Sequence, residues 1–573
     1  MNSDLKKNGT FTQLTKEGNG CNPMHKWVQT NYPLLLMIAF VLLAACLFVQ
    51  WCLLESLHHG RLAAVPIYDD VTYFAAGAQV LQSLRDGHVL QTFAGHMHSP
   101  FAVLLAAASF AIWGAKDWAP YAGNGIVILC YLGTLAFFFR RLPIGLQMGL
   151  LILFLGLPFA TMAVVEFRPD MMWATLVGFA TVYQITARGA FSSRTEALAL
   201  GLLYGAAMMT KPSTFLMTTA AIGLGGLLRL LREALCGKLK MSQFFAWFTL
   251  FLLAALLVAG AYYFFHFGKI WRYFYLNSFG KNKEVWILSQ SLVENLSYYI
   301  GAQDAPASNL GKWRLPILLF VGLSLLLGIV RPDNKEQRLI YLSLAIAMIG
   351  TWLASSLFEM KSPFLGGAFY GVLICGTAFF LRNVLTRFQT FFSRPITQSF
   401  TFVILALFCL MMYTWPAYSE WDDATARYYR TANDGVWREI RKTLRRYSPV
   451  DGVVDIYCTN SSPIPQALLS LRAIQKRTSL RVHSGTLLEV MESHRALFDS
   501  CDVLIVQDPS LPGVNPSLPG EKLQMRITEE VLSRPDFELV KAIALGNKQI
   551  YVLHNRELLL ATQQTANARP VEK

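Results

Sequence analysis

The class of fold is decided by Pro33–Leu54, PLLLMIAFVLLAACLFVQWCLL, a run of 22 residues that includes no Lys, Arg, Asp or Glu. A helix of this length spans about 33 Å, which is enough to cross a hydrocarbon core of about 30 Å. Similar apolar runs continue to Trp415, and the chain of 573 residues is 54% hydrophobic with a mean hydropathy of +0.38. The sequence therefore predicts a polytopic α-helical membrane protein.

Basic clusters indicate how the helices are oriented in the membrane. Lys6, Lys7, Lys16 and Lys26 precede the first span, which places the amino terminus in the cytoplasm, and no cleavable signal pattern is found. The apolar run 99–114 is too short for a crossing and is expected to dip into or lie on the outer leaflet. An odd number of spans then places the carboxy terminus outside. The eleven predicted spans are 33–54, 119–139, 144–162, 171–187, 195–210, 213–229, 243–265, 314–330, 339–357, 367–381 and 398–415.

Composition divides the chain into three parts. We expect a cytoplasmic tail at 1–32, a membrane domain at 33–416 and an extracytoplasmic domain at 417–573. The membrane domain includes outer juxtamembrane helices at 55–118 and an outer loop at 266–313 that is rich in basic and aromatic residues.

The extracytoplasmic part has the pattern of a small α/β domain. Helical patterning covers 423–446, and short apolar runs at 452–458, 503–506 and 549–553 are typical of buried strands in a parallel or mixed sheet. Residues 417–573 carry 20 Lys and Arg against 19 Asp and Glu, so almost all of the net charge of +14 belongs to the membrane part. Cytoplasmic loops and outer anions explain such a bias, which argues against a nucleic-acid partner.

Two adjacent acids follow the first span in the stretch Tyr68-Asp69-Asp70-Val71-Thr72-Tyr73. The peptide around them can form a helix on the membrane surface, so the carboxylates are placed for chemistry at the edge of the bilayer, where one can act as a base. The alternative is a helix cap without chemistry.

Three further motifs lie in predicted outer turns. They are His98-Ser99-Pro100-Phe101 leading to Ile112-Trp113-Gly114, Glu166-Phe167-Arg168-Pro169-Asp170, and Met209-Thr210-Lys211-Pro212. Together with the acidic pair, this series resembles the motifs of the GT-C membrane glycosyltransferases, in the same order and across residues 33–260. The resemblance is strongest to the branch that includes protein mannosyltransferases and the aminoarabinose transferase.

The resemblance implies inverting transfer of a sugar from a polyprenyl-phosphate donor to an extracytoplasmic glycolipid, polysaccharide or protein. In that family the first-loop acid deprotonates the acceptor hydroxyl, which makes Asp69 the expected base. Asp70 stands where a glutamate is common, so it either orients the acceptor, binds a metal or supports Asp69. The resemblance also implies that cations stabilise the departing phosphate.

Each remaining candidate has a functional and a structural interpretation. Arg168, Lys211, Lys361 and His98 are the candidates for binding the donor phosphate, although Lys211 would also suit ordinary lipid headgroups. Glu166 and Asp170 would support Arg168 or bind the acceptor, or would form an ion pair that only fixes their turn. The loop 266–313 is either an aromatic and basic belt or a mobile cover over the lipid donor.

No cofactor is firmly implied. His96 and His98 could bind a divalent metal with Asp69 or Asp70, but an interfacial hydrogen-bonding cluster is favoured over a metal site. Cys458 and Cys501 in the outer domain form either a disulfide or two buried thiols.

Other functional classes remain open. One alternative is a membrane transporter, although transporters place ionisable residues near the bilayer midplane, whereas these residues are in outer turns. The other is a catalytically inactive GT-C-like assembly subunit. The resemblance also favours a bacterial inner membrane.

Overall fold

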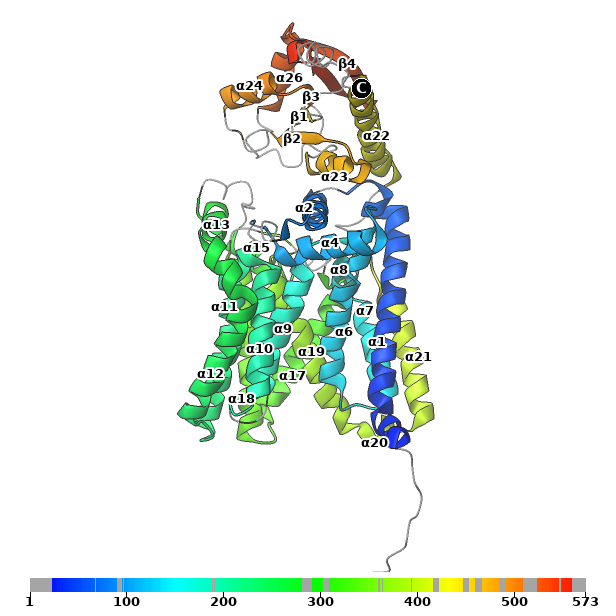
Figure 1. The fold of residues 1–573 in the computed structure, drawn as a ribbon. Helices are drawn as coiled ribbons and strands as arrows, with labels where there is room; N and C mark the ends of the chain where they lie inside the picture. The colour runs from blue at the N-terminus through cyan, green and yellow to red at the C-terminus, as the bar shows by residue number, and fades with distance from the viewer. Residues whose placement is uncertain are drawn as a thin grey trace, which may run out of the picture.

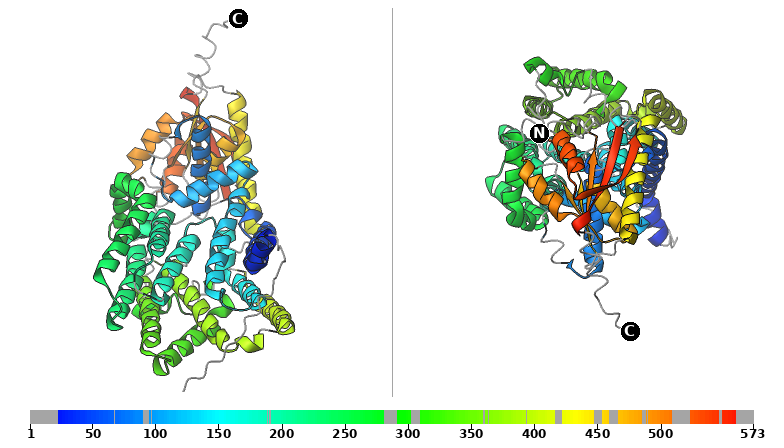
Figure 2. Two further views of the ribbon diagram at one scale, coloured as in Figure 1. Left: turned by 60° about the horizontal axis from the view of Figure 1, so that its bottom comes forward. Right: turned by 90° about the horizontal axis from the view of Figure 1, so that it is seen from above.

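A bundle of long helices is capped at one end by short crosswise helices and by a small α/β domain, as Figure 1 shows for the computed structural model. Seen along the bundle, the α/β domain lies over the end of the membrane helices (Figure 2). The residues described are 23–66, 68–89, 95, 97–187, 189, 191–280, 291–301, 309–358, 361–362, 364–392, 394–415, 422–446, 453–458, 466–484, 488, 490–508, 523–545 and 548–558.

Helices occupy all eleven of the expected spans. The bundle is built from α1 Pro23–His59, α6 Gly125–Phe139, α7 Ile144–Leu155, α8 Pro158–Val165, α9 Asp170–Thr186, α10 Arg194–Thr210, α11 Phe215–Leu235, α12 Met241–Ala255, α13 Ala261–Ser278, α17 Arg314–Val330, α18 Lys335–Leu357, α19 Gly367–Arg387 and α21 Pro395–Met412. Among the described residues, seven helices are long and apolar enough to cross a membrane, or eight if the bent pair α7 and α8 is one span. The count of eleven crossings is therefore not confirmed.

Two of the expected spans differ in shape from the expectation. The run 144–162 is bent by 66° between α7 and α8, because Pro158 has no amide hydrogen to continue the helix. The run 243–265 extends further than expected, since a π-helical turn at Leu256–Gly260 joins α12 to α13 and the helix ends only at Ser278. The segment 266–313 thus begins as a helix rather than as a loop.

The crosswise helices are α2 Tyr68–Arg85 and α4 Pro100–Trp113. The 14 residues of α4 give a length of about 21 Å, and the helix lies across the end of the bundle instead of spanning it (Figure 1). Ser99 caps α4 by accepting a hydrogen bond from the amide of Ala102 at 3.3 Å. A Cβ at Gly77 would lie 2.5 Å from that of Ala106, so the two helices are in close contact.

The α/β domain contains one mixed five-stranded sheet of order β2-β1-β3-β5-β4. Its strands are β1 Val454–Cys458, β2 Leu480–Ser484, β3 Val503–Gln507, β4 Phe537–Leu545 and β5 Lys548–Asn555, and its helices are α22 Asp423–Arg446, α23 Gln466–Lys476, α24 Met491–Ser500 and α26 Gln524–Ser533. β1 is parallel to β2 and β3, whereas β5 is antiparallel to β3 and β4. The three strands expected from the sequence are all present. Cys458 and Cys501 are both buried and no disulfide joins them, so the expected disulfide is absent.

Contacts of α23 with the crosswise helices and with the turn after α4 hold the α/β domain over the bundle. The guanidinium of Arg472 donates to both carboxylate oxygens of Asp117, at 2.7 and 2.8 Å, and Gln475 donates to the same carboxylate at 3.0 Å. Leu468 and Leu471 are fully buried in a cluster with apolar residues of α2 and α4. The helix that carries Asp69 is therefore packed between the membrane bundle and the α/β domain.

The architecture predicts on which side of the membrane each end lies. A cysteine introduced at Glu492 in the α/β domain should react with an impermeant maleimide from the same side as one at Asp86, just after α2. A cysteine at Lys335, where α18 begins, should react only from the opposite side. Labelling of positions 492 and 335 from one side would contradict this topology.

Candidate active site at the capped end of the bundle

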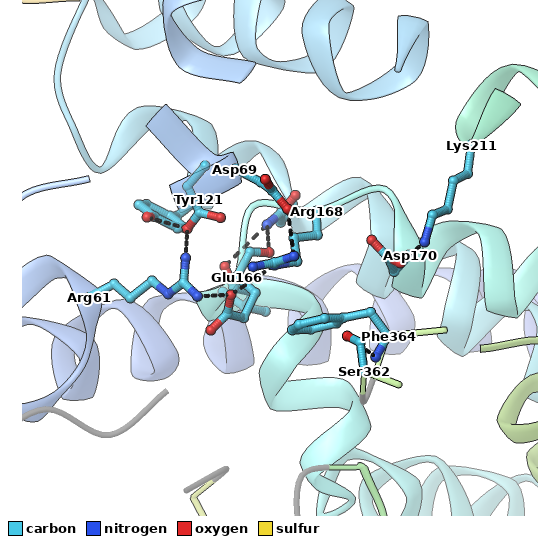
Figure 3. A network of polar contacts seen from close by, with 12 residues as sticks. Arg61, Asp69, Tyr121, Glu166, Arg168, Asp170, Lys211, Ser362 and Phe364 are labelled. Carbon is cyan, nitrogen blue, oxygen red and sulfur yellow. Dashed lines mark hydrogen bonds and ion pairs between the residues drawn. The ribbon is translucent and has the colours of Figure 1, made fainter. Parts of the chain in front are cut away.

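Three of the chain segments that contain the sequence motifs meet at this end of the bundle (Figure 3). Asp69 and Asp70 lie in the first turn of α2, Glu166 and Arg168 follow α8, and Asp170 begins α9. Lys211 ends α10. Asn124 fixes the turn after α8, because its amide donates to the carbonyl oxygens of Val164 and Glu166 at 3.2 and 3.1 Å.

A buried arginine links two of these segments. Arg61 lies in the short 3₁₀ turn after α1, and its side chain is 1% exposed. Its guanidinium contacts Asp70 at 2.7 Å and forms an ion pair with Glu166. The hydroxyl of Tyr121 donates to the same oxygen of Asp70 at 2.7 Å. Asp70 and Glu166 are thus held as partners in a buried ion network, which we name the Arg61 clamp.

Asp69 is in a different environment although it is adjacent to Asp70. Its side chain is 61% exposed, compared with 0% for Asp70. The guanidinium of Arg168 donates to Asp69 at 2.7 Å and to Glu166 at 3.3 Å, while it lies 4.1 Å from the ring centroid of Phe364. Of the two adjacent acids, only Asp69 can therefore meet a substrate.

A second ion pair lies beside the clamp. Lys211 forms an ion pair with Asp170, and its ammonium lies 5.6 Å from the ring centroid of Trp173. Ser99 donates to the carbonyl oxygen of Thr210 at 2.7 Å, which ties the start of α4 to the turn before Lys211. This hydrogen bond brings the motif containing His98 next to that containing Lys211.

The remaining motif residues surround these ion pairs. The His98 ring is exposed and lies 4.5 Å from the ring of Tyr273 on α13. Burial, together with the carboxylates of Asp69 and Asp170, raises the pKa of the Tyr73 hydroxyl well above its ordinary value. Tyr73 therefore stays protonated near neutral pH and does not compete with Asp69 as a base.

A cavity of about 260 Å³ opens between α2 and the start of α4. Thr72, Tyr73, Gln79 and His98 are among the residues that line it. The cavity adjoins the exposed acid, because Thr72 lies one helical turn after Asp69.

Lys361 is positioned differently from the other cations. Its ammonium donates to the carbonyl oxygens of Ser355 and Ser356, at 3.4 and 2.6 Å, and to that of Phe358. These carbonyl groups lie at the carboxyl end of α18, so the contacts favour a helix-capping role over the expected contact with phosphate.

The described residues contain no group of three or more His, Cys, Asp and Glu side chains that could bind a metal. His96 lies outside the described residues.

Sequence patterns had not indicated Arg61 or Tyr121. The one available signal for Arg61 was a lone cation between an apolar span and an acidic motif.

Comparison with known proteins identifies the fold. No protein-family model and no curated protein matches the sequence. The structure is similar to the crystal structure of ArnT from Cupriavidus metallidurans in the apo state, with a TM-score of 0.53 and 11% sequence identity over 93% of this chain and 99% of that chain. It is also similar to ArnT of the same organism bound to undecaprenyl phosphate, with a TM-score of 0.52 and 11% identity over 92% and 98% of the two chains.

This similarity confirms the fold that the sequence resemblance implied. The chain has the fold of ArnT, with a carboxy-terminal α/β domain, and is an integral membrane protein.

The different environments of the two acids predict different stabilities for their asparagine variants. Asp70→Asn should lower the free energy of unfolding by about 3 kcal/mol, because it leaves Arg61 with one buried carboxylate partner. Asp69→Asn, the matched control, should cost at most about 1 kcal/mol, since its ion pair faces solvent. Thermal unfolding of the purified variants would measure the difference, and equal midpoints would show that the Arg61 clamp is not buried as described.

Proposed function

We propose that this protein is an inverting glycosyltransferase that moves a sugar from a polyprenyl-phosphate donor to an extracytoplasmic acceptor. The observation that carries the proposal is the pair of Asp69 and Arg168. An exposed carboxylate contacts a cation at one end of a membrane bundle, and the buried Arg61 clamp fixes the segments that hold both. The likeness to an ArnT structure that contains undecaprenyl phosphate supports the class of donor.

The acid supplies the base for the reaction. An acceptor hydroxyl is a weak nucleophile, so its proton must be removed as its oxygen bonds to the anomeric carbon. Asp69 accepts this proton, while the bond between the anomeric carbon and the phosphate oxygen breaks. Attack from the face opposite the phosphate inverts the configuration at that carbon.

The cations stabilise the departing phosphate, whose charge increases as the bond breaks. Arg168 and Lys211 are the donors we assign to it, and His98, whose neighbour Ser99 is hydrogen-bonded to the turn before Lys211, would add a further hydrogen bond. In the structure these cations pair with Asp69 and Asp170. If Arg168 exchanged its hydrogen bond to Asp69 for one to the phosphate, the carboxylate of Asp69 would be free to accept the proton.

The acceptor has a candidate position in the cavity of about 260 Å³ between α2 and α4. Its polar lining from Thr72 and Gln79 suits a hydroxylated molecule. Outside the cavity, Asp170 and Glu166 act as supports for the cations. The acceptor is a glycolipid, polysaccharide or protein of the cell envelope. We place the site on the outer face of a bacterial inner membrane, with the α/β domain outside.

The ion pairs favour an enzyme over a transporter. A transporter places its ionisable residues near the bilayer midplane, whereas the Arg61 clamp and the pair of Lys211 and Asp170 lie where α2 and α9 begin and α10 ends. An inactive assembly subunit would have no use for an exposed acid held beside a cation.

Asp69→Asn should lower the rate of sugar transfer about 10²- to 10⁴-fold without changing the fold, because it removes the proton acceptor and keeps the shape of the side chain. Transfer from an undecaprenyl-phosphate-linked sugar would be measured with purified protein. Asp86→Asn, an exposed acid just after α2, is the control and should keep full activity. Wild-type rates for Asp69→Asn would exclude Asp69 as the base.

Lys211→Ala should weaken binding of undecaprenyl phosphate about tenfold, the effect of one lost charge-assisted hydrogen bond. It should lower kcat/KM for the donor by at least the same factor, since the phosphate's charge grows in the transition state. Lys116→Ala removes an exposed cation at the same end and should change neither quantity. Unchanged donor binding by a thermally weakened Lys211→Ala protein would show that Lys211 only anchors its turn.

A further inference from the structure

A larger cavity, of about 620 Å³, lies at the opposite end of the bundle. It is lined by the carboxyl ends of α6, α9 and α19 and by the amino end of α18. α9 begins at Asp170, in the candidate active site, and ends at Thr186, in the wall of this cavity. Helices of 15 to 21 residues separate the two sites by about 23 to 32 Å.

Arginines dominate the wall of this cavity. Arg140 and Arg141 follow α6, and Arg382 and Arg387 lie in the last turns of α19. Two carboxylates also line it, but both are engaged by cations: Lys238 donates to Glu336 at 2.6 Å, and Arg387 lies 3.6 Å from Asp333. In the described part of the chain, neither Arg140 nor Arg141 has a carboxylate partner. The cavity therefore carries an excess of positive charge.

Aromatic rings orient two of these guanidinium groups. The guanidinium of Arg140 lies 3.9 Å from the ring centroid of Phe137, and that of Arg382 lies 4.7 Å from the ring centroid of Phe379. Arg382 also donates to the side-chain oxygen of Asn383 at 2.9 Å. Guanidinium groups held in this way lose little freedom when they bind an anion.

The cavity also has an apolar wall, which Phe138, Ile340 and Tyr341 form with side chains that are almost fully buried. Basic residues at the ends of membrane helices are ordinary in themselves. Here they surround a cavity that has the volume of a small-molecule site and both cationic and apolar surfaces. A molecule that matches it needs a phosphate group next to a hydrocarbon chain.

We propose that this cavity binds the phosphate of an anionic phospholipid headgroup. Arg140, Arg141 and Arg382 donate to the phosphate oxygens, and the apolar wall contacts the first part of the acyl chains. Basic pockets between membrane helices are suited to such headgroups. The assignment is independent of the glycosyltransferase reaction, because none of these residues belongs to the candidate active site.

Binding of short-chain lipids to the full-length protein in detergent tests the proposal. Dioctanoylphosphatidylglycerol should bind and raise the unfolding midpoint, while dioctanoylphosphatidylcholine, which has no net charge, should bind at least tenfold more weakly. The double variant Arg140→Gln, Arg141→Gln should lose at least tenfold in affinity for the anionic lipid. Arg331→Gln, Arg394→Gln removes two exposed arginines at the same end outside the cavity and should bind normally.

Further comparisons separate the alternatives. Lys211→Ala should keep its affinity for the anionic lipid, whereas a loss there with none in the double variant would place the lipid in the candidate active site and overturn the proposal. Equal binding of the two lipids would also overturn it.

Inorganic phosphate that binds as tightly as the lipid, in a manner lost in the double variant, would support the phosphate site and assign it to a soluble ligand. If the double variant does not fold, Arg141→Gln alone should bind the anionic lipid several-fold more weakly, and unchanged binding would overturn the proposal.

Discussion

The ion network of Arg61 with Asp70 and Glu166 is the interaction on which the rest of the candidate site depends. Burying an unpaired charge costs a large amount of free energy. These three side chains can therefore be buried only as partners of one another. They come from the turn after α1, the start of α2 and the turn after α8. The network thereby fixes where α2 begins relative to the membrane bundle.

The exposure of Asp69 follows from the burial of its neighbour Asp70. Successive residues on a helix point about 100° apart, so a start of α2 that buries Asp70 turns Asp69 toward solvent. In the same way, the extended chain after α8 buries Glu166 and leaves Arg168 beside Asp69. Two adjacent acids thus have distinct roles, one in stability and one, as we propose, in proton transfer.

The sequence predicted the elements with strong periodicity or chemistry of their own. Apolar runs located the membrane helices, and the acidic pair pointed to the candidate site. β2 and β4 were missed because they form the two edges of the sheet, where exposed residues remove the apolar run. The bend before Pro158 could have been expected from that proline. The role of Arg61 could not have been expected, because its two partners are 9 and 105 residues away along the chain and no local pattern links them. Lys361 was assigned to phosphate from its outer position alone, whereas its contacts with the end of α18 became visible only in the fold.

A structure of the protein bound to undecaprenyl phosphate would test the central claim most directly. The account predicts the phosphate within about 4 Å of Lys211 or Arg168, on the side of Asp69 that faces solvent, with the Arg61 clamp unchanged. A phosphate bound elsewhere, with the pairs Asp69–Arg168 and Lys211–Asp170 intact, would contradict the assignment of this site to the donor.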